Sequence, residues 1–381
     1  MLVVEILFWV CSGLIAWTHL LYPLYAAAFA RVAARPPRSA DILPRVLMVV
    51  AAYNEESVIE RRLENLLALD YPPELLRIVV SSDASSDGTN AIVERIAARE
   101  PRVSLLVNPR GGKIQAQDRA VREQAGDAEV LAFSDANCTW APEALRLLVR
   151  PLADPQVAYV CGQLRILDAD GVNKEGAYWR YELWLRGNES AVHSVTGGNG
   201  SIYAVRRGAY VEVHPSMGHD LSFPYRMVQG GGRAVYEPAA LAFEKPSTDT
   251  EEEYRRKVRM FEHCWLIVLR GKMLRRLPPR YLLAILSHRH ARYLTGVFHI
   301  GALVLNIDLV ARHPGAVLYW LTLAVQLGAL ALALAGKARL PVPFAALAWY
   351  YTLVSWATTK ALLNYLRRGV PPVWEKAAGS R

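Results

Sequence analysis

Long apolar runs lie at both ends of the chain and indicate membrane segments. Residues 2–30 are almost entirely apolar, and a helix that rises about 1.5 Å per residue needs roughly 20 residues to cross the hydrocarbon layer. Pro23 is expected to kink this helix, because proline removes a backbone hydrogen bond. Three more apolar runs near the C-terminus are read in the same way, over residues 293–310, 317–335 and 342–366.

Basic residues beside these runs predict how the chain is oriented. Arg31, Arg35, Arg38 and Arg45 follow the first run, whereas a cleavable signal peptide carries its basic residues before a shorter apolar core. By the positive-inside rule, the first run is an anchor and the sequence after it lies in the cytoplasm. The basic tail over residues 367–381 predicts a cytoplasmic C-terminus as well.

These runs predict an N-terminal transmembrane helix over residues 1–31 and about three C-terminal ones within residues 293–366. Three crossings that start from a cytoplasmic domain would leave the tail outside. Either one run does not cross the membrane or the charge rule fails, and the last run, which contains Lys360 and Asn364, is the least lipid-like. The pattern predicts a multi-pass protein of the cell (inner) membrane and leaves the number of crossings open.

Between the apolar ends, short buried runs alternate with segments of helical periodicity. The predicted strands cover residues 46–52, 77–81, 103–107 and 129–133, and two of the helices between them cover 58–67 and 90–98. This alternation predicts an α/β domain with a mostly parallel sheet and right-handed crossovers. Ligands of such sheets bind at the carboxyl ends of the strands, where we expect Glu55, Asp83, Asp87, Lys113 and Asp135 to gather.

Residues 250–292 are basic and apolar together and predict amphipathic helices that lie in the membrane interface. The alternative is an ordinary amphipathic helix beneath the soluble domain.

Composition narrows the class of protein. Of 381 residues, 52% are hydrophobic and 21% are charged, which excludes a disordered chain, a collagen-like fibre and a pure membrane bundle. The net charge of +9 fits loops that face an anionic leaflet better than it fits nucleic-acid binding. The four cysteines are scattered without a CxxC pair, so neither a disulfide framework nor a zinc site is indicated.

The loops after the predicted strands indicate which kind of ligand the site binds. The loop after the first strand has no GxGxxG sequence, which argues against the usual dinucleotide site. Acidic residues follow the strands instead, and a hard divalent cation often bridges such carboxylates to phosphate.

Several motifs, taken in order, resemble the signatures of family 2 glycosyltransferases, which have a GT-A fold. They are Ala52-Tyr-Asn-Glu-Glu56, Asp83-Ala-Ser-Ser-Asp87-Gly-Thr89, Lys113, Ser134-Asp-Ala-Asn137, Thr196-Gly-Gly-Asn-Gly-Ser201, Gly218-His-Asp-Leu221, Gly232–Ala239 and Tyr254–Met260. Each motif is weak alone, and their order on successive loops makes the resemblance specific. It covers about residues 44–260 and implies a GT-A domain over residues 44–249.

The resemblance implies transfer of a sugar from a nucleotide diphosphate to an acceptor hydroxyl, with inversion. It places Asn54 and Glu55 beside the nucleotide and Asp83 on the base ring, with a UDP-sugar favoured over a GDP-sugar. Lys113 would assist with the phosphates, and Arg256 and Arg259 share a helix face from which they could close over the diphosphate. The alternative for the two arginines is a basic face that touches anionic lipid.

By the same resemblance, Asp135 and Asn137 would bind Mg²⁺ or Mn²⁺, and Asp220 would be the general base. The sequence departs from the family pattern at three positions. Asn137 replaces the second aspartate of the metal motif, and His219 replaces the first acid of the usual pair. Met260 stands where processive synthases carry a tryptophan, although Phe261 and Trp265 are close by.

The sequence therefore predicts a membrane-anchored, cytoplasm-facing glycosyltransferase with a membrane-associated, lipid-linked acceptor. One alternative is a processive polysaccharide synthase that also translocates its product. Another is a non-catalytic GT-A-like subunit of a membrane assembly. The presence of Asp135 and Asp220, the residues expected to bind the metal and to act as the base, argues against this alternative. A small-solute transporter is the least favoured, because its polar sites should lie inside membrane helices.

Overall fold

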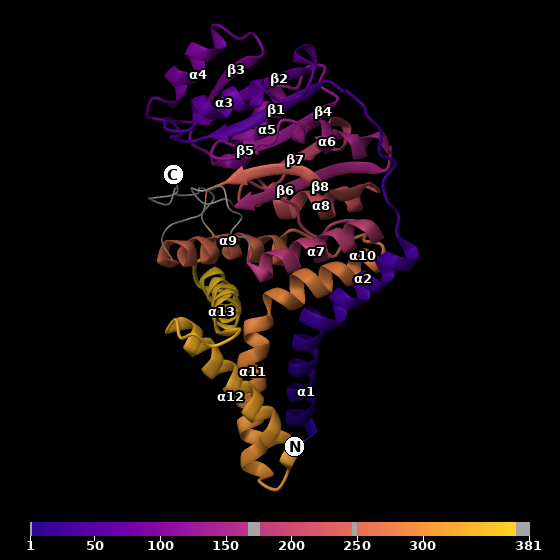
Figure 1. The fold of residues 1–381 in the computed structure, drawn as a ribbon, viewed down its shortest axis with the longest axis vertical. Helices are drawn as coiled ribbons and strands as arrows, with labels where there is room; N and C mark the ends of the chain where they lie inside the picture. The colour runs from indigo at the N-terminus through magenta and orange to yellow at the C-terminus, as the bar shows by residue number, and fades with distance from the viewer. Residues whose placement is uncertain (1, 167–175, 246–249, 371–381) are drawn as a thin grey trace.

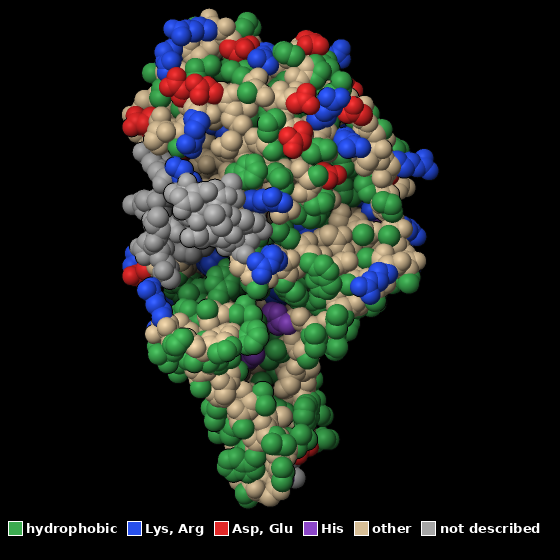
Figure 2. Space-filling view, in the orientation of Figure 1, with side chains coloured by type: hydrophobic (Ala, Val, Ile, Leu, Met, Phe, Trp, Pro, Cys, Tyr) green, Lys and Arg blue, Asp and Glu red, His purple; other side chains and the backbone are tan. Residues whose placement is uncertain are grey.

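The computed structural model describes residues 2–166, 176–245 and 250–370. Figure 1 shows a body that contains the sheet and a narrow stem of helices below it. In Figure 2 charged side chains cover the body, whereas the surface of the stem is mostly hydrophobic. The sequence predicts an α/β domain joined to membrane helices, and the body with its sheet and the hydrophobic helical stem confirm this architecture.

The described residues form a mixed eight-stranded sheet in the order β3-β2-β1-β4-β7-β6-β8-β5. The half containing β3, β2, β1 and β4 is parallel, β7 runs antiparallel to both β4 and β6, and β8 runs parallel to β6. The strands are β1 Val46–Ala52, β2 Leu76–Asp83, β3 Val103–Asn108, β4 Val130–Asp135, β5 Thr139–Trp140, β6 Val157–Ile166, β7 Tyr203–Arg206 and β8 Arg233–Glu244.

The parallel half follows directly from the buried runs of the sequence. Every residue from Val46 to Val50 is buried, as a strand covered by helices on both faces requires. The crossover helices bury one apolar stripe each against the sheet, as Ile59, Leu63 and Leu66 do in α3. The helices of the body are α3 Ile59–Leu67, α4 Thr89–Ala97, α5 Lys113–Gln124, α6 Ala144–Val149, α7 Ala177–Val192, α8 His219–Gln229 and α9 Thr250–Arg270.

The N-terminal apolar run forms one bent helix. It comprises α1 Leu2–Ala16, a π-helical segment Trp17–Leu21 and α2 Tyr22–Ala33. Pro23 has no N–H for the carbonyl of His19, and the Tyr181 hydroxyl donates to that carbonyl instead at 2.9 Å. The expected kink therefore lies at the π-helical segment and Pro23, and Figure 1 shows α1 running along the stem while α2 turns beneath the body.

Among the described residues, three helical segments are long and apolar enough to cross a membrane: Leu2–Ala33, α11 Thr295–Arg312 and α12 Val317–Lys337. The third C-terminal run forms α13 Ala345–Arg368, which does not meet that criterion and packs against both α9 and α12. Trp265 of α9 donates its indole N–H to the carbonyl of Thr358 at 2.9 Å. The run with the least lipid-like composition is thus the one held against the body.

The segment predicted to be interfacial contains α9, α10 Pro279–Ile285 and a second π-helical segment, Leu286–Ala291. Tyr281, Ile285 and His288 are each at most 1% exposed. This burial fits the alternative of a helix packed beneath the body, and contact with the membrane interface stays a prediction. Of the predicted basic tail, residues 371–381 lie outside the described residues.

Candidate active site

The loops after β1 and β2 are joined to each other by hydrogen bonds. Asn54 has a positive φ of 53°, which asparagine tolerates better than most residues. Its side-chain oxygen accepts from the Ser86 N–H at 2.8 Å, and its own N–H donates to Ser85 Oγ at 3.1 Å. The N–H of Glu55 donates to Thr89 Oγ1 at 2.8 Å. The two residues predicted to lie beside the nucleotide thus sit where two strand-end loops meet.

Asp83 ends β2 and organises the loop after β3. Its carboxylate pairs with Arg110 and accepts from the N–H groups of Gly111 at 2.7 Å and Gly112 at 3.0 Å. Its side chain is only 4% exposed. Arg110 in turn lies over the Tyr53 ring, 3.5 Å from its centroid. Sequence reasoning missed this stacked pair, which Arg110 joins to the predicted base-binding residue Asp83.

Lys113 and Asp135 form the centre of the site. Lys113 is the first residue of α5 and follows Gly112, whose φ is +90°. The Lys113 ammonium pairs with Asp135 Oδ1, and Ser201 Oγ donates to Asp135 Oδ2 at 2.9 Å. Burial alone would lower the pKa of Lys113, but the charge and hydrogen bond of Asp135, together with the Asp220 charge and Cys138, outweigh burial and raise this pKa. A positive charge is therefore already held at the carboxylate predicted to bind a metal.

Glu244 is an acidic residue of this site that sequence reasoning missed. It ends β8, and the antiparallel pairing of Thr139 with Phe243 brings it beside Asn137. The Asn137 side-chain N–H donates to Glu244 Oε1 at 2.8 Å. Burial and the nearby charge of Asp135 raise the pKa of Glu244. The only signal in the sequence was an acid at a strand end, without a motif around it.

The donor set around Asp135 suits a hard divalent cation. Asp135 and Glu244 supply carboxylate oxygens, and Asn137 supplies an amide oxygen, since its nitrogen already donates to Glu244. Oxygen ligands of this kind are those that Mg²⁺ and Mn²⁺ prefer. Within the described ranges no group of three His, Cys, Asp or Glu side chains is close enough to hold a metal. The residues present fit a cation that shares its coordination with another oxygen-rich ligand.

Asp220 approaches this centre from the other side. It lies in the first turn of α8, its side chain is exposed, and its backbone carbonyl accepts from the Gly198 N–H at 2.6 Å. A methyl group at Gly200 would lie 3.7 Å from Lys113 Nζ and 3.9 Å from Asp220 Cβ. The residues predicted for the phosphates, the metal and the base, far apart in sequence, therefore meet around Gly200 and Ser201.

The histidines near Asp220 have structural surroundings. His219 is buried, its Nδ1 lies 2.8 Å from the Tyr203 hydroxyl, and its ring stacks on Phe223. Burial lowers the pKa of His219 well below its usual value. His263 Nδ1 lies 2.8 Å from the carbonyl of Ser216. These contacts favour structural roles over metal ligation.

Helix α9 brings one of the two predicted arginines to the site. Arg256 is exposed, and its charge is among those that lower the pKa of Glu244. Arg259 lies one turn further along and is half-buried. Met260 is 37% exposed.

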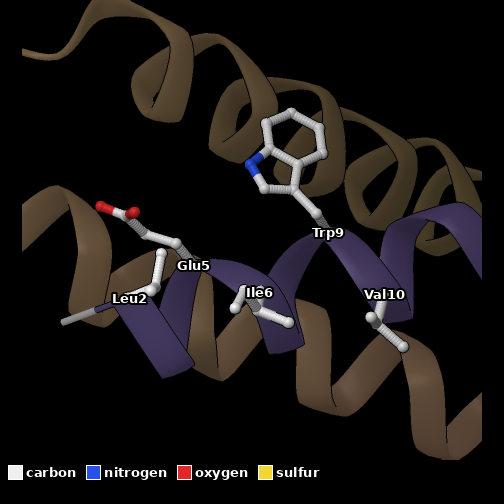
Figure 3. A pocket seen from close by; sticks show the side chains of 5 residues that line it. All are labelled: Leu2, Glu5, Ile6, Trp9 and Val10. Carbon is white, nitrogen blue, oxygen red and sulfur yellow. The ribbon is translucent and has the colours of Figure 1, made fainter.

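One hollow of about 430 Å³ lies far from these residues, on helix α1 of the stem. Figure 3 shows its lining residues, Leu2, Glu5, Ile6, Trp9 and Val10, along a short stretch of that helix. The hollow belongs to the apolar stem and holds none of the predicted site residues.

Comparison with known proteins bears on the same region. The family described as glycosyl transferase family 2 matches residues 48–213. A probable glycosyltransferase, YdaM, from Bacillus subtilis is 25% identical over 296 residues, which cover 69% of this chain and 67% of that protein. The beta-monoglucosyldiacylglycerol synthase of Synechocystis is 27% identical over 221 residues, and the poly-beta-1,6-N-acetyl-D-glucosamine synthase of Staphylococcus aureus is 23% identical over 217 residues.

The aligned regions cover 52% and 55% of this chain and 43% and 52% of those two synthases, about half of their length. Among solved structures, the mannosyltransferase PcManGT from Pyrobaculum calidifontis, in complex with GDP-Man and Mn²⁺, has a similar fold with a TM-score of 0.73. The likeness covers 96% of this chain and 99% of that protein at 23% identity.

Proposed function

This chain is a family 2 glycosyltransferase, and from that premise we propose that it transfers one sugar from a nucleotide-diphosphate donor to the hydroxyl of a membrane-associated, lipid-linked acceptor. The observation that carries the proposal is the meeting of Lys113, Asp135 and Asp220 around Gly200. A cation-binding carboxylate and a separate carboxylate at the acceptor side are the two acids that such a transfer needs.

In this mechanism the donor lies across the strand-end loops. Asn54, Glu55 and Asp83 line the nucleotide side, and the Tyr53–Arg110 pair offers a flat surface for the base. Lys113 and Arg256 neutralise the diphosphate, and a part for Arg259 stays a prediction. Asp135, Asn137 and Glu244 would hold Mg²⁺ or Mn²⁺, which supplies Lewis-acid stabilisation of the leaving diphosphate.

Asp220 completes the reaction by taking the proton of the acceptor hydroxyl. The hydroxyl oxygen then bonds to the anomeric carbon as the bond to the diphosphate breaks. Because base and leaving group lie on opposite sides of the sugar, the configuration at that carbon is inverted. The membrane-capable helices and the relative that makes a glucosyldiacylglycerol support an acceptor delivered by the membrane. We place the catalytic body on the cytoplasmic side, as the basic residues after the first helix predict.

The processive alternative is less favoured by the surroundings of the aromatic residues. Trp265 is 3% exposed and donates to the carbonyl of Thr358, so it is not presented to a glycan chain. Met260 occupies the position at which processive synthases carry a tryptophan. These two observations favour addition of a single sugar.

The proposal is tested by release of nucleoside diphosphate from the detergent-purified chain. UDP- and GDP-sugars are offered in turn, with Mn²⁺ and with or without a membrane lipid extract; the preference for UDP stays a prediction, and PcManGT was solved with GDP-Man. Release that requires the lipid extract is the expected result. No release with any donor would contradict the proposal and favour the non-catalytic alternative.

Glu244→Gln is predicted to weaken Mn²⁺ binding about 10- to 100-fold, the range seen when groups that support a metal are removed. The change keeps the shape of the side chain and its contact with Asn137 but removes a negative charge beside Asp135. Isothermal titration of Mn²⁺ into the purified chain measures this affinity without turnover. Glu237→Gln, on the same strand, is the matched control and should bind as wild type; equal affinity in both variants would remove Glu244 from the metal site.

A further inference from the structure

A buried ionic cluster lies where the body meets the membrane helices. We call Glu182, Glu189, His288 and Arg292 the junction cluster. His288 Nδ1 lies 2.8 Å from Glu189 Oε1, His288 Nε2 lies 3.0 Å from Glu182 Oε2, and Arg292 pairs with Glu182. The four side chains are between 2% and 15% exposed.

The contacts of this cluster favour the ionised form of its two glutamates. An ionised carboxylate only accepts hydrogen bonds, so a ring nitrogen of His288 that bonds to an ionised glutamate is the donor. Burial alone would raise the pKa of Glu182 and of Glu189. The neighbouring groups together outweigh burial and lower both pKa values: Arg292, His288 and Arg289 act on Glu182, and His288, Arg289 and the Tyr22 hydroxyl act on Glu189. The two glutamates therefore stay ionised beside Arg292 and Arg289 in a place that solvent barely reaches.

The junction cluster is bonded to the N-terminal membrane helix. The Tyr22 hydroxyl donates to Glu189 Oε1 at 2.7 Å, and Arg292 donates to the carbonyl of Thr18 at 3.0 Å. The two π-helical segments, which face each other here, are joined by the bond from Thr18 Oγ1 to the carbonyl of Ser287 at 2.7 Å. π-Helical turns of this kind occur often at functional sites.

On its other side the junction cluster is bonded to the segment that precedes the site. Thr196 Oγ1 donates to Glu189 Oε2 at 2.9 Å, and His288 Nδ1 lies 3.1 Å from the same hydroxyl. Arg289 donates to the carbonyl of Thr196 at 3.2 Å. Two residues later, the Gly198 N–H donates to the carbonyl of Asp220 at 2.6 Å.

The segment has little room to move within these contacts. A methyl group at Gly197 would lie 2.4 Å from Arg289 Nη2, and one at Gly198 would lie 1.9 Å from the Tyr159 hydroxyl. A side chain at either position would therefore force Arg289 or Tyr159 to shift. A displacement of Thr196 would be passed through this packed segment to Asp220.

We propose that His288 is a positioning residue, which holds Thr196 and, through Gly198, sets the place of Asp220 relative to the helices that enter the membrane. This inference rests on the proposed function, in which Asp220 is the base. An acceptor held in the bilayer presents its hydroxyl at a fixed distance from the membrane surface, and the carboxylate of Asp220 must lie at the same distance. His288 contacts Glu189, which accepts a hydrogen bond from Tyr22 of the N-terminal helix, so the position of Asp220 is linked to that helix.

The test compares two histidines of the same π-helical segment in the full chain, reconstituted into lipid vesicles. His288→Gln removes any positive charge and leaves one amide nitrogen in place of the two ring nitrogens that face Glu182 and Glu189. It should lower kcat for transfer about 10- to 100-fold, because a misplacement of about 1 Å can cost about 100-fold. Donor affinity should stay within about twofold, since Asn54 and Asp83 lie on separate loops with their own contacts. His290→Gln is the control; its ring contacts the carbonyl of Ile285 and not the junction cluster.

Variants of Thr196 separate positioning from general stability. Thr196→Ser keeps the hydroxyl and should retain the wild-type kcat. Thr196→Val lacks the hydroxyl and should lower kcat by as much as His288→Gln does. The kcat of the double variant His288→Gln/Thr196→Val should be little lower than that of either single variant, because both changes interrupt the same chain of hydrogen bonds.

Three outcomes would overturn the inference: wild-type kcat in His288→Gln, an equal loss in His290→Gln, or a parallel loss of donor affinity and kcat that marks unfolding. Its failure is distinct from failure of the proposed function. If Asp220→Asn turns over normally, the base assignment is wrong. If Asp220→Asn is inactive while His288→Gln keeps its kcat, only the positioning role is wrong.

Discussion

Asp220→Asn is expected to lower the rate of sugar transfer about 10²- to 10⁴-fold, the contribution typical of a general base. The amide cannot take the proton of the acceptor hydroxyl, although it has nearly the same shape as the carboxylate. Donor binding should be unchanged within about twofold, because the nucleotide residues lie on the loops after β1, β2 and β3. Release of nucleoside diphosphate gives the rate, and titration of the donor gives the affinity.

The variant should remain folded. Asp220 is exposed in the first turn of α8, where loss of its charge removes only about 0.3–1 kcal/mol of interaction with the helix dipole. Asp127→Asn is the matched control, since Asp127 is 68% exposed and pairs with Arg45 and Arg77 away from the site. Normal turnover by Asp220→Asn would show that another group takes the proton.

The parallel half of the sheet could be predicted from the sequence because each of its strands is an apolar run between two turns. The predicted strand over residues 46–52 matches β1 Val46–Ala52. The other half was not predicted strand by strand. β7 Tyr203–Arg206 is four residues long and follows a glycine-rich segment, and its place between β4 and β6 depends on pairing across distant parts of the chain.

The candidate site was predictable where it follows strand ends and motifs. Lys113, Asp135 and Asp220 do lie together, whereas Asp87 accepts from the N–H of Thr89 at 3.0 Å and stabilises the start of α4. Glu244 escaped prediction because its approach to Asn137 is set by the pairing of β5 with β8.

The junction with the membrane could be predicted least. Sequence alone distinguished apolar runs from basic flanks, but hydropathy carries no information about which polar groups pair inside. His288 looked like one of several basic residues in an amphipathic segment, and only the fold places it between two carboxylates of α7. Buried charge pairs of this kind are visible only once the partners are in place.

The second large effect concerns Asp135. Asp135→Ala is expected to lower transfer about 10³-fold or more, since a bound metal supplies several kcal/mol of stabilisation and about 1.36 kcal/mol corresponds to tenfold in rate. The variant also leaves Lys113 and Ser201 without the carboxylate that holds them. Rates of nucleoside diphosphate release, measured with and without EDTA, check this prediction.

Chelation separates the metal role of Asp135 from its structural one. EDTA should suppress the wild-type chain to the level of the variant, and added Mn²⁺ should restore the wild type but not Asp135→Ala. Asp70→Ala, which removes a 61% exposed aspartate that pairs with Arg146, should behave as wild type throughout. Full activity in the presence of chelator would leave Asp135 as the partner of Lys113 alone, with the ammonium neutralising the diphosphate. Because Lys113 pairs with Asp135, that outcome can be tested with a further variant. Lys113→Met would then lower the rate of transfer as much as Asp135→Ala does.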